Sequence, residues 1–138
     1  MKTMSELDAP KVEPEVAVVS NVETIAVADL LKRVQEFCDQ DSRFVTATCL
    51  DLGDRFEVLY HFDKGLELKH LRVLVGKDEE VPSLSGIYLC AFLVENEMRE
   101  LFGINITGIA LDYRGRLLLT EECPRRPMLK MEKDAEST

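Results

Sequence analysis

Cysteine and histidine side chains could give this sequence nucleophilic or metal chemistry. They are Cys38, Cys49, Cys90, Cys123, His61 and His70. A thiol enzyme needs a histidine beside its cysteine, and Cys49 or Cys90 with either histidine is the available pairing. No two cysteines lie close in sequence, and the CxxC spacing typical of zinc and iron–sulfur sites is absent. We therefore expect no metal ligand and no catalytic residue, and we interpret the cysteines as packed thiols.

Three carboxylates in the stretch ENEMRELFGI are candidates for acid–base or metal chemistry. They are Glu95, Glu97 and Glu100, and no histidine stands at metal-binding spacing from any of them. We interpret them as a solvated or partner-facing helix edge. Arg99 follows Glu95 by one helical turn and can pair with it, which contributes only about 0.3–0.5 kcal/mol when exposed.

Arginines crowd into the last quarter of the chain, as Arg114, Arg116, Arg125 and Arg126. Prolines flank the last two in the string CPRRPM. Guanidinium groups suit bidentate carboxylate pairing at interfaces, and proline lowers the entropy lost when an extended segment docks. A solvated basic patch is the simpler alternative, and we favour docking onto another protein.

The overall charge limits the partners. The chain has 138 residues, 46% of them hydrophobic, and a formal net charge of -9. One domain with a real core is expected from this length and composition. The negative charge argues against nucleic acid, which is bound through lysine and arginine. The sequence contains no apolar run long enough to span a membrane and no signal-peptide core, so we expect a cytoplasmic chain without a membrane span.

Periodicity predicts the elements that must position these residues. Apolar residues at helical spacing predict a helix over 30–38, with Asp29 as its cap. Alternating runs over 43–52, 55–62 and 66–75, separated by glycine-containing turns, predict an antiparallel meander. The string VAVV at 16–19 could add an edge strand or belong to a disordered tail.

A second helix is predicted from Pro82 and Ser83 to Phe102, where Gly103 can adopt the left-handed conformation that ends a helix. The strings INITGIAL and RLLL are candidates for further short strands. The expected fold class is α+β, an antiparallel sheet of three to four strands with two helices packed on it. We divide the chain into an N-terminal arm at 1–20, the domain at 21–120 and an extended C-terminal arm at 121–138.

This ordered series of segments resembles the C subunit, or 30-kilodalton subunit, family of respiratory complex I. The family also includes counterparts in membrane-bound, energy-converting nickel–iron hydrogenases. Its signature helix reads roughly E-R-E-x-Y-D-L-F-G-I, which is matched here by Glu95, Glu97, Leu101, Phe102, Gly103 and Ile104. The sequence departs from the signature at Asn96, Arg99 and Glu100. CPRRPMLK stands where G-H-P-L-R-K is usual, and the long C-terminal extension is missing.

The resemblance implies a subunit that binds no cofactor and performs no chemistry. It would brace the catalytic large subunit and the small iron–sulfur subunit, beside ferredoxin-like and membrane subunits, on the inner face of the cell membrane. The short chain resembles most the Ech-type hydrogenase counterpart, whose partners carry the [NiFe] centre and [4Fe-4S] clusters and couple ferredoxin-dependent hydrogen evolution to ion translocation. A respiratory NADH:quinone oxidoreductase or a formate hydrogenlyase-like complex is the alternative. A free-standing regulatory domain and a small thiol enzyme are alternatives of other classes. The predicted partner interface comprises Glu95, Glu97, Arg99, Phe102, Gly103, Arg114, Arg116, Arg125 and Arg126.

Overall fold

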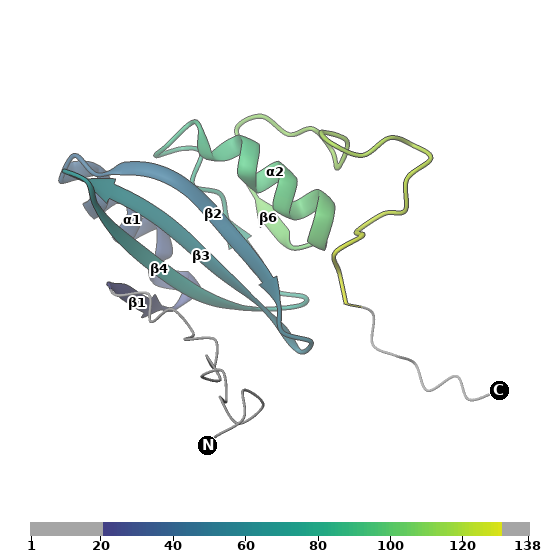
Figure 1. Cartoon of the computed structure of the whole chain (residues 1–138), viewed down its shortest axis with the longest axis horizontal. Coiled ribbons are helices and arrows are strands. Elements are labelled where there is room, and N and C mark those ends of the chain that lie inside the picture. The colour runs from purple at the N-terminus through teal and green to yellow at the C-terminus, as the bar shows by residue number, and fades with distance from the viewer. Residues whose placement is uncertain (1–20, 131–138) are drawn as a thin grey trace, which may run out of the picture.

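A computed structural model describes residues 21–130 and shows two helices beside a curved sheet (Figure 1). The elements are β1 Val22–Ile25, the 3-10 turn η2 Val27–Asp29, α1 Leu30–Asp39, β2 Arg43–Asp51, β3 Arg55–Lys64, β4 Glu67–Gly76, β5 Glu80–Pro82, α2 Ala91–Phe102 and β6 Asn105–Thr107. The predicted strand at 16–19 lies outside the described residues. Among residues 21–130, no helix has the length and apolar character needed to cross a membrane.

The meander of β2, β3 and β4 is antiparallel, as the alternating runs predicted. Phe56 of β3 lies opposite Asp51 on one neighbouring strand and Val75 on the other. Gly53 and Gly65 have φ angles of 99° and 59°, which tight turns between such strands demand and which glycine adopts without strain. This register turns every second residue of β3 toward the core.

A fourth strand makes the main sheet mixed rather than antiparallel throughout. β1 pairs with β4 in parallel, and the strand order is β1-β4-β3-β2. The sequence did not reveal this strand because VETI is only four residues long and is followed directly by η2 and α1.

Both helices pack on one face of the sheet, which confirms the α+β class. Phe37 of α1 stacks on Phe62 with 4.7 Å between ring centroids, and Phe102 of α2 meets the edge of Phe56 at 6.5 Å. Phe56 and Phe62 are separated by an even number of residues on β3, so their side chains share a face. A single apolar core therefore joins the sheet to both helices.

Helix α2 begins at Ala91, later than the predicted start at Ser83. Residues 80–82 instead form β5, which pairs in parallel with β6, and the amide of Ser83 donates to the carbonyl of Thr107 at 2.8 Å. This pairing holds the chain extended where periodicity favoured a helix. Gly103 ends α2 with φ of 76°, as predicted, whereas Asp29 stands at the N-cap of α1 without a side-chain cap hydrogen bond.

Candidate functional site

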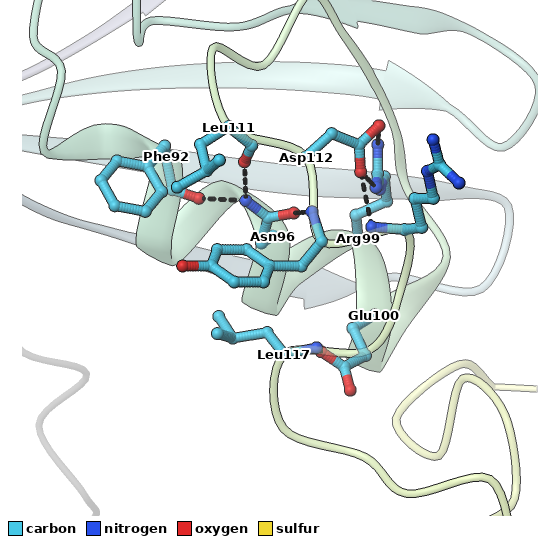
Figure 2. Close-up of polar contacts among 9 residues, drawn as sticks. Phe92, Asn96, Arg99, Glu100, Leu111, Asp112 and Leu117 are labelled. Carbon is cyan, nitrogen blue, oxygen red and sulfur yellow. Dashed lines mark hydrogen bonds and ion pairs between the residues drawn. The ribbon is translucent and has the colours of Figure 1, made fainter.

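The polar face of α2 anchors a long loop of the same chain. Asn96 is 1% exposed, and its Nδ2 donates to the carbonyl oxygens of Phe92 at 2.7 Å and Leu111 at 2.8 Å. Its Oδ1 accepts the amide of Tyr113 at 3.0 Å. Figure 2 shows this side chain between the helix and the loop. Asn96 thus fixes where the chain passes after β6.

Glu100, one turn further along α2, fixes the next part of the loop. Its buried carboxylate accepts the amides of Leu117 and Leu118 at 2.9 Å and also the amide of Leu119. Three successive backbone N–H groups around one carboxylate form strong, charge-assisted hydrogen bonds. The string RLLL is therefore not a strand, because these amides donate to Glu100 and not to a ladder.

Arg99 lies between these two anchors and forms a bidentate pair with Asp112. Asp112 also accepts the amide of Arg114 at 2.7 Å. The hydrogen bond from Arg99, and after it the bond from the Arg114 amide, lowers the pKa of the Asp112 carboxyl below its usual range. The predicted pairing of Arg99 with Glu95 is wrong, since Asp112 takes its place.

The loop and the following segment enclose a cavity of about 330 Å³ beside the end of α2. Its charged lining consists of Arg99, Arg114, Arg116, Arg125, Arg126, Glu100 and Glu121. We call this the arginine pocket. It brings together all five arginines of the predicted interface, although they lie on a helix and on separate stretches of loop.

The arginines of the pocket differ in their partners. Arg99 pairs with Asp112, and Arg116 pairs with Glu121. Among residues 21–130, no ion pair involves Arg114, Arg125 or Arg126. The pocket therefore holds three arginines that take no part in the ion pairs of residues 21–130, in a chain whose formal net charge is -9.

The segment that carries Arg125 and Arg126 docks on its own domain over residues 121–130, a part of the chain for which the sequence predicts an extended arm. The amide of Met128 donates to the carbonyl of Leu101 at 2.9 Å. The amide of Lys130 donates to Asp51 Oδ2 at 2.7 Å. The Arg126 side chain lies so close to Gly103 that a Cβ there would stand 2.6 Å from its Cδ.

The structure corrects the prediction that Glu95 belongs to the partner interface. The Glu95 side chain is 1% exposed and points to the loop before α2, where it accepts the hydroxyl of Ser83 and the amide of Leu84. Burial raises the pKa of Glu95, against the lowering effect of these two hydrogen bonds. A carboxylate engaged in this way inside the chain is not a surface for a partner, because residues 83–85 cover it.

The other residues of the predicted interface lie in different environments. Glu97 is exposed on α2. Phe102 is 9% exposed and belongs to the core, as Met98 does. Gly103 lies under Arg126. The structure thus gathers the arginines and leaves Glu97 apart from them.

The buried cysteine of the thiol-enzyme alternative, Cys49, is unsuited to act as a nucleophile. Burial raises the pKa of Cys49 to about 12, with a smaller effect from Asp51, so that the thiol stays protonated near neutral pH. His61 and His70 bond to each other through their Nδ1 atoms at 2.6 Å, and Thr48 contacts His61 Nε2 at 2.9 Å. In the described part of the chain, no hydrogen bond joins a cysteine to a histidine, and no three potential ligands gather where they could hold a metal ion.

Sequence reasoning missed the residues that build the pocket without lining it. Asn96 and Asp112 are the clearest cases. Asparagine is a weak helix former, so its presence inside α2 was the available sign of a role outside the helix. Its position one turn before Glu100 places the two side chains on the same side of α2. An asparagine side chain inside a helix either faces water or bonds to nearby backbone, and here it bonds to a loop distant in sequence.

The fold and the site together define a small α+β domain with both helices on one sheet face and a cationic cavity at the end of α2. The family described as "Respiratory-chain NADH dehydrogenase, 30 Kd subunit" matches residues 17–137. The chain belongs to this family.

Individual relatives match shorter stretches. The C subunit of NADH-quinone oxidoreductase from Sinorhizobium medicae (strain WSM419) is 39% identical over 57 residues, and that from Rhizobium rhizogenes (strain K84 / ATCC BAA-868) is 40% identical over 58 residues. Each match covers 40% of this chain and 28% of the relative. The chain thus spans less than a third of the length of these curated relatives.

A solved structure shares the fold. A chain of the membrane-bound sulfane sulfur reductase (MBS), an archaeal respiratory membrane complex, aligns with a TM-score of 0.63 over 77% of this chain and 65% of that one, at 15% identity. At this identity the likeness concerns the fold alone.

Proposed function

We propose that this chain is a non-catalytic structural subunit in the peripheral arm of a membrane-bound, complex I-like assembly, and specifically of an energy-converting [NiFe] hydrogenase. The family match over residues 17–137 carries the subunit role, and the departures from the family signature at Asn96, Arg99 and Glu100 support the hydrogenase. The chain would brace a catalytic large subunit against a small iron–sulfur subunit. It would sit on the cytoplasmic side, attached to the membrane through its partners.

The geometry supports a bracing role. Asn96, Arg99 and Glu100 bond to the chain's own loop, which fixes the arginine pocket in place. These hydrogen bonds select one arrangement of the loop, and a preformed arrangement lowers the entropy lost when partners bind. The [NiFe] centre and the [4Fe-4S] clusters belong, in this proposal, to partner subunits.

A second candidate is the C subunit of a respiratory NADH:quinone oxidoreductase. The relatives from Sinorhizobium medicae and Rhizobium rhizogenes carry the name of the C subunit of NADH-quinone oxidoreductase, which favours this candidate. The departures from the family signature favour the hydrogenase.

Purification from native membranes separates the two candidates. The chain is tagged at a terminus, the membranes are solubilised in mild detergent, and co-purifying proteins are identified by mass spectrometry. A nickel-containing hydrogenase large subunit and hydrogen evolution from reduced ferredoxin are expected. NADH-oxidising subunits with quinone reduction would establish the second candidate. A chain that elutes alone, without either set of proteins, would contradict both.

A further inference from the structure

The arginine pocket carries an inference about what the subunit holds. We propose that it is a carboxylate-binding site that accepts an acidic segment of a neighbouring protein subunit. This rests on the proposed function, because it assigns one docking site within that assembly.

The charge balance of the pocket indicates an anionic occupant. Five arginines and two glutamates line a cavity of about 330 Å³. Three of the arginines, Arg114, Arg125 and Arg126, form no ion pair within the described residues. Against the five arginines, Glu100 and Glu121 supply two negative charges, so the charged lining stays positive. Guanidinium groups that converge in this way fit the paired oxygens of a carboxylate.

Backbone strain at two of these arginines supports the assignment. Arg114 and Arg126 have φ angles of 55° and 52°, in the left-handed region that arginine rarely adopts. Only three other non-glycine residues of the described chain have a positive φ, namely Asn21, Asp41 and Leu66. Residues held in such conformations cluster at ligand-binding sites, where the surrounding structure maintains them.

The overall charge favours a protein occupant. A formal net charge of -9 disfavours nucleic acid and anionic membranes, whose many charges would face much of the acidic surface. A confined positive cavity in an acidic molecule therefore suits a short anionic segment presented at close range. In a multisubunit assembly such a segment is an acidic loop or terminus of a neighbour.

Cys123 provides a reporter inside the pocket. It lines the cavity and is exposed, and Cys90 is exposed at the start of α2 outside it. The full-length chain is treated with iodoacetamide, which is uncharged, and alkylation of both cysteines is followed by mass spectrometry in the same sample. Hexaglutamate, hexalysine or inorganic phosphate is added in parallel.

Hexaglutamate at about ten times its dissociation constant should slow alkylation of Cys123 about tenfold by mass action and leave Cys90 unchanged. Hexalysine and phosphate should have no effect. Protection by phosphate without protection by the peptide would replace the inference with a small-anion site. An unchanged rate at Cys123 with all three additives would overturn it.

Two pocket variants and one control variant test the residues. Arg125→Gln with Arg126→Gln should abolish protection, whereas Arg55→Gln at the β2–β3 turn should retain it. Arg114→Gly removes a guanidinium and relieves the left-handed backbone together, so the melting temperature should hold while protection weakens. Protection that survives both changes would contradict the assignment.

The assembled complex distinguishes this inference from the proposed function. In complex purified from membranes, Cys123 should be alkylated about tenfold more slowly than in the isolated chain, by the same occupancy argument. If partners co-purify but Cys123 reacts at the free rate, the pocket inference fails and the subunit role stands. If no partner co-purifies, the subunit role fails, and the peptide experiment still decides whether the pocket binds carboxylates.

Discussion

The meander at residues 43–76 and the loop segment at residues 108–130 are stabilised by different means. In the meander, apolar side chains alternate on paired strands and pack against both helices, so each residue depends on many neighbours. In the loop segment, the side chains of Asn96, Glu100 and Asp51 hold the backbone through a few hydrogen bonds. The first region is a cooperative core, and the second is a set of separate attachments.

Local opening should begin in the loop segment. Regions with few buried apolar contacts open at lower free energy than core strands. Residues 108–130 are mostly exposed, and Ile109 and Leu129 are the apolar side chains there that pack partly against the core. The segment that forms the arginine pocket should therefore detach without unfolding the sheet.

Removal of a core ring should have the largest effect. Phe102→Ala takes away the ring that joins α2 to Phe56, and should lower the free energy of unfolding by about 3–5 kcal/mol. Leu93 is 51% exposed on the same helix, so Leu93→Ala serves as the control and should change stability by less than about 0.5 kcal/mol. Urea denaturation followed by circular dichroism measures both. Equal losses in the two variants would show that α2 does not depend on this core contact.

The core region could be predicted from the sequence because its signal is local. Each strand of the meander shows its own alternation, and each turn carries its own glycine. The helix start at Ala91 could not be predicted in this way. Val81 and Ser83 are held extended by β6, which follows them by more than twenty residues in the chain, and this long-range pairing overrides the local periodicity.

The pocket could be predicted only in part. Its arginines stood out by residue type, and the five lie together as one cluster. The supports did not stand out, because the role of Glu100 depends on backbone amides that come near it only in the folded chain. Glu95 looked like its neighbours on a charged helix edge, yet Ser83 and Leu84 enclose it. A charge pattern on a helix does not reveal which charges another loop covers.

Loss of the Glu100 carboxylate should have the second-largest effect, confined to the loop. In Glu100→Gln an amide group faces the N–H groups of Leu117, Leu118 and Leu119, so charge-assisted bonds are lost. We expect the protection of these amides in hydrogen exchange to fall by about 1.5–3 kcal/mol, with the amides of β3 unchanged. Glu97→Gln, at an exposed position on the same helix, is the control. A parallel loss in β3 would mean that the two regions open as one.

The hydrogen bond from the Lys130 amide to Asp51 is the last attachment of residues 108–130 to the domain. Burial of Asp51 raises the carboxyl pKa, but the Lys77 ammonium and the amides of Gly53 and Lys130 lower it by more, so the pKa lies below its usual value. A carboxyl with a depressed pKa contributes stability above its unfolded pKa and loses it as the pH falls through the folded value. The attachment should therefore persist from neutral pH to about pH 4, and weaken only in stronger acid.

In Asp51→Asn we expect the protection factor of the Lys130 amide to fall by about 0.5–1.5 kcal/mol at neutral pH, with the amides of β3 unaffected. Asp54→Asn, at an exposed position in the neighbouring turn, should leave the Lys130 amide as in the wild type. Nuclear magnetic resonance between pH 7 and pH 3 measures these factors residue by residue. An unaltered Lys130 amide in Asp51→Asn would show that packing of Leu129, and not this carboxylate, fixes the segment.

The smallest expected effect concerns the histidine pair on the sheet face away from the helices. Burial, and then the nearby charge of His70, lowers the pKa of His61, so the folded chain binds fewer protons there than the unfolded chain. Stability from this site is complete above the unfolded histidine pKa of about 6.5, and is lost as the pH falls from there through the folded value. His61 is only partly buried, so water screens its charge. The loss of stability should therefore be smaller than the losses predicted for the Phe102, Glu100 and Asp51 variants. Urea denaturation at pH 7.5 and pH 5 should show a larger fall in the free energy of unfolding for the wild type than for His61→Gln. A larger fall in the variant would mean that protonation of His61 stabilises the folded chain.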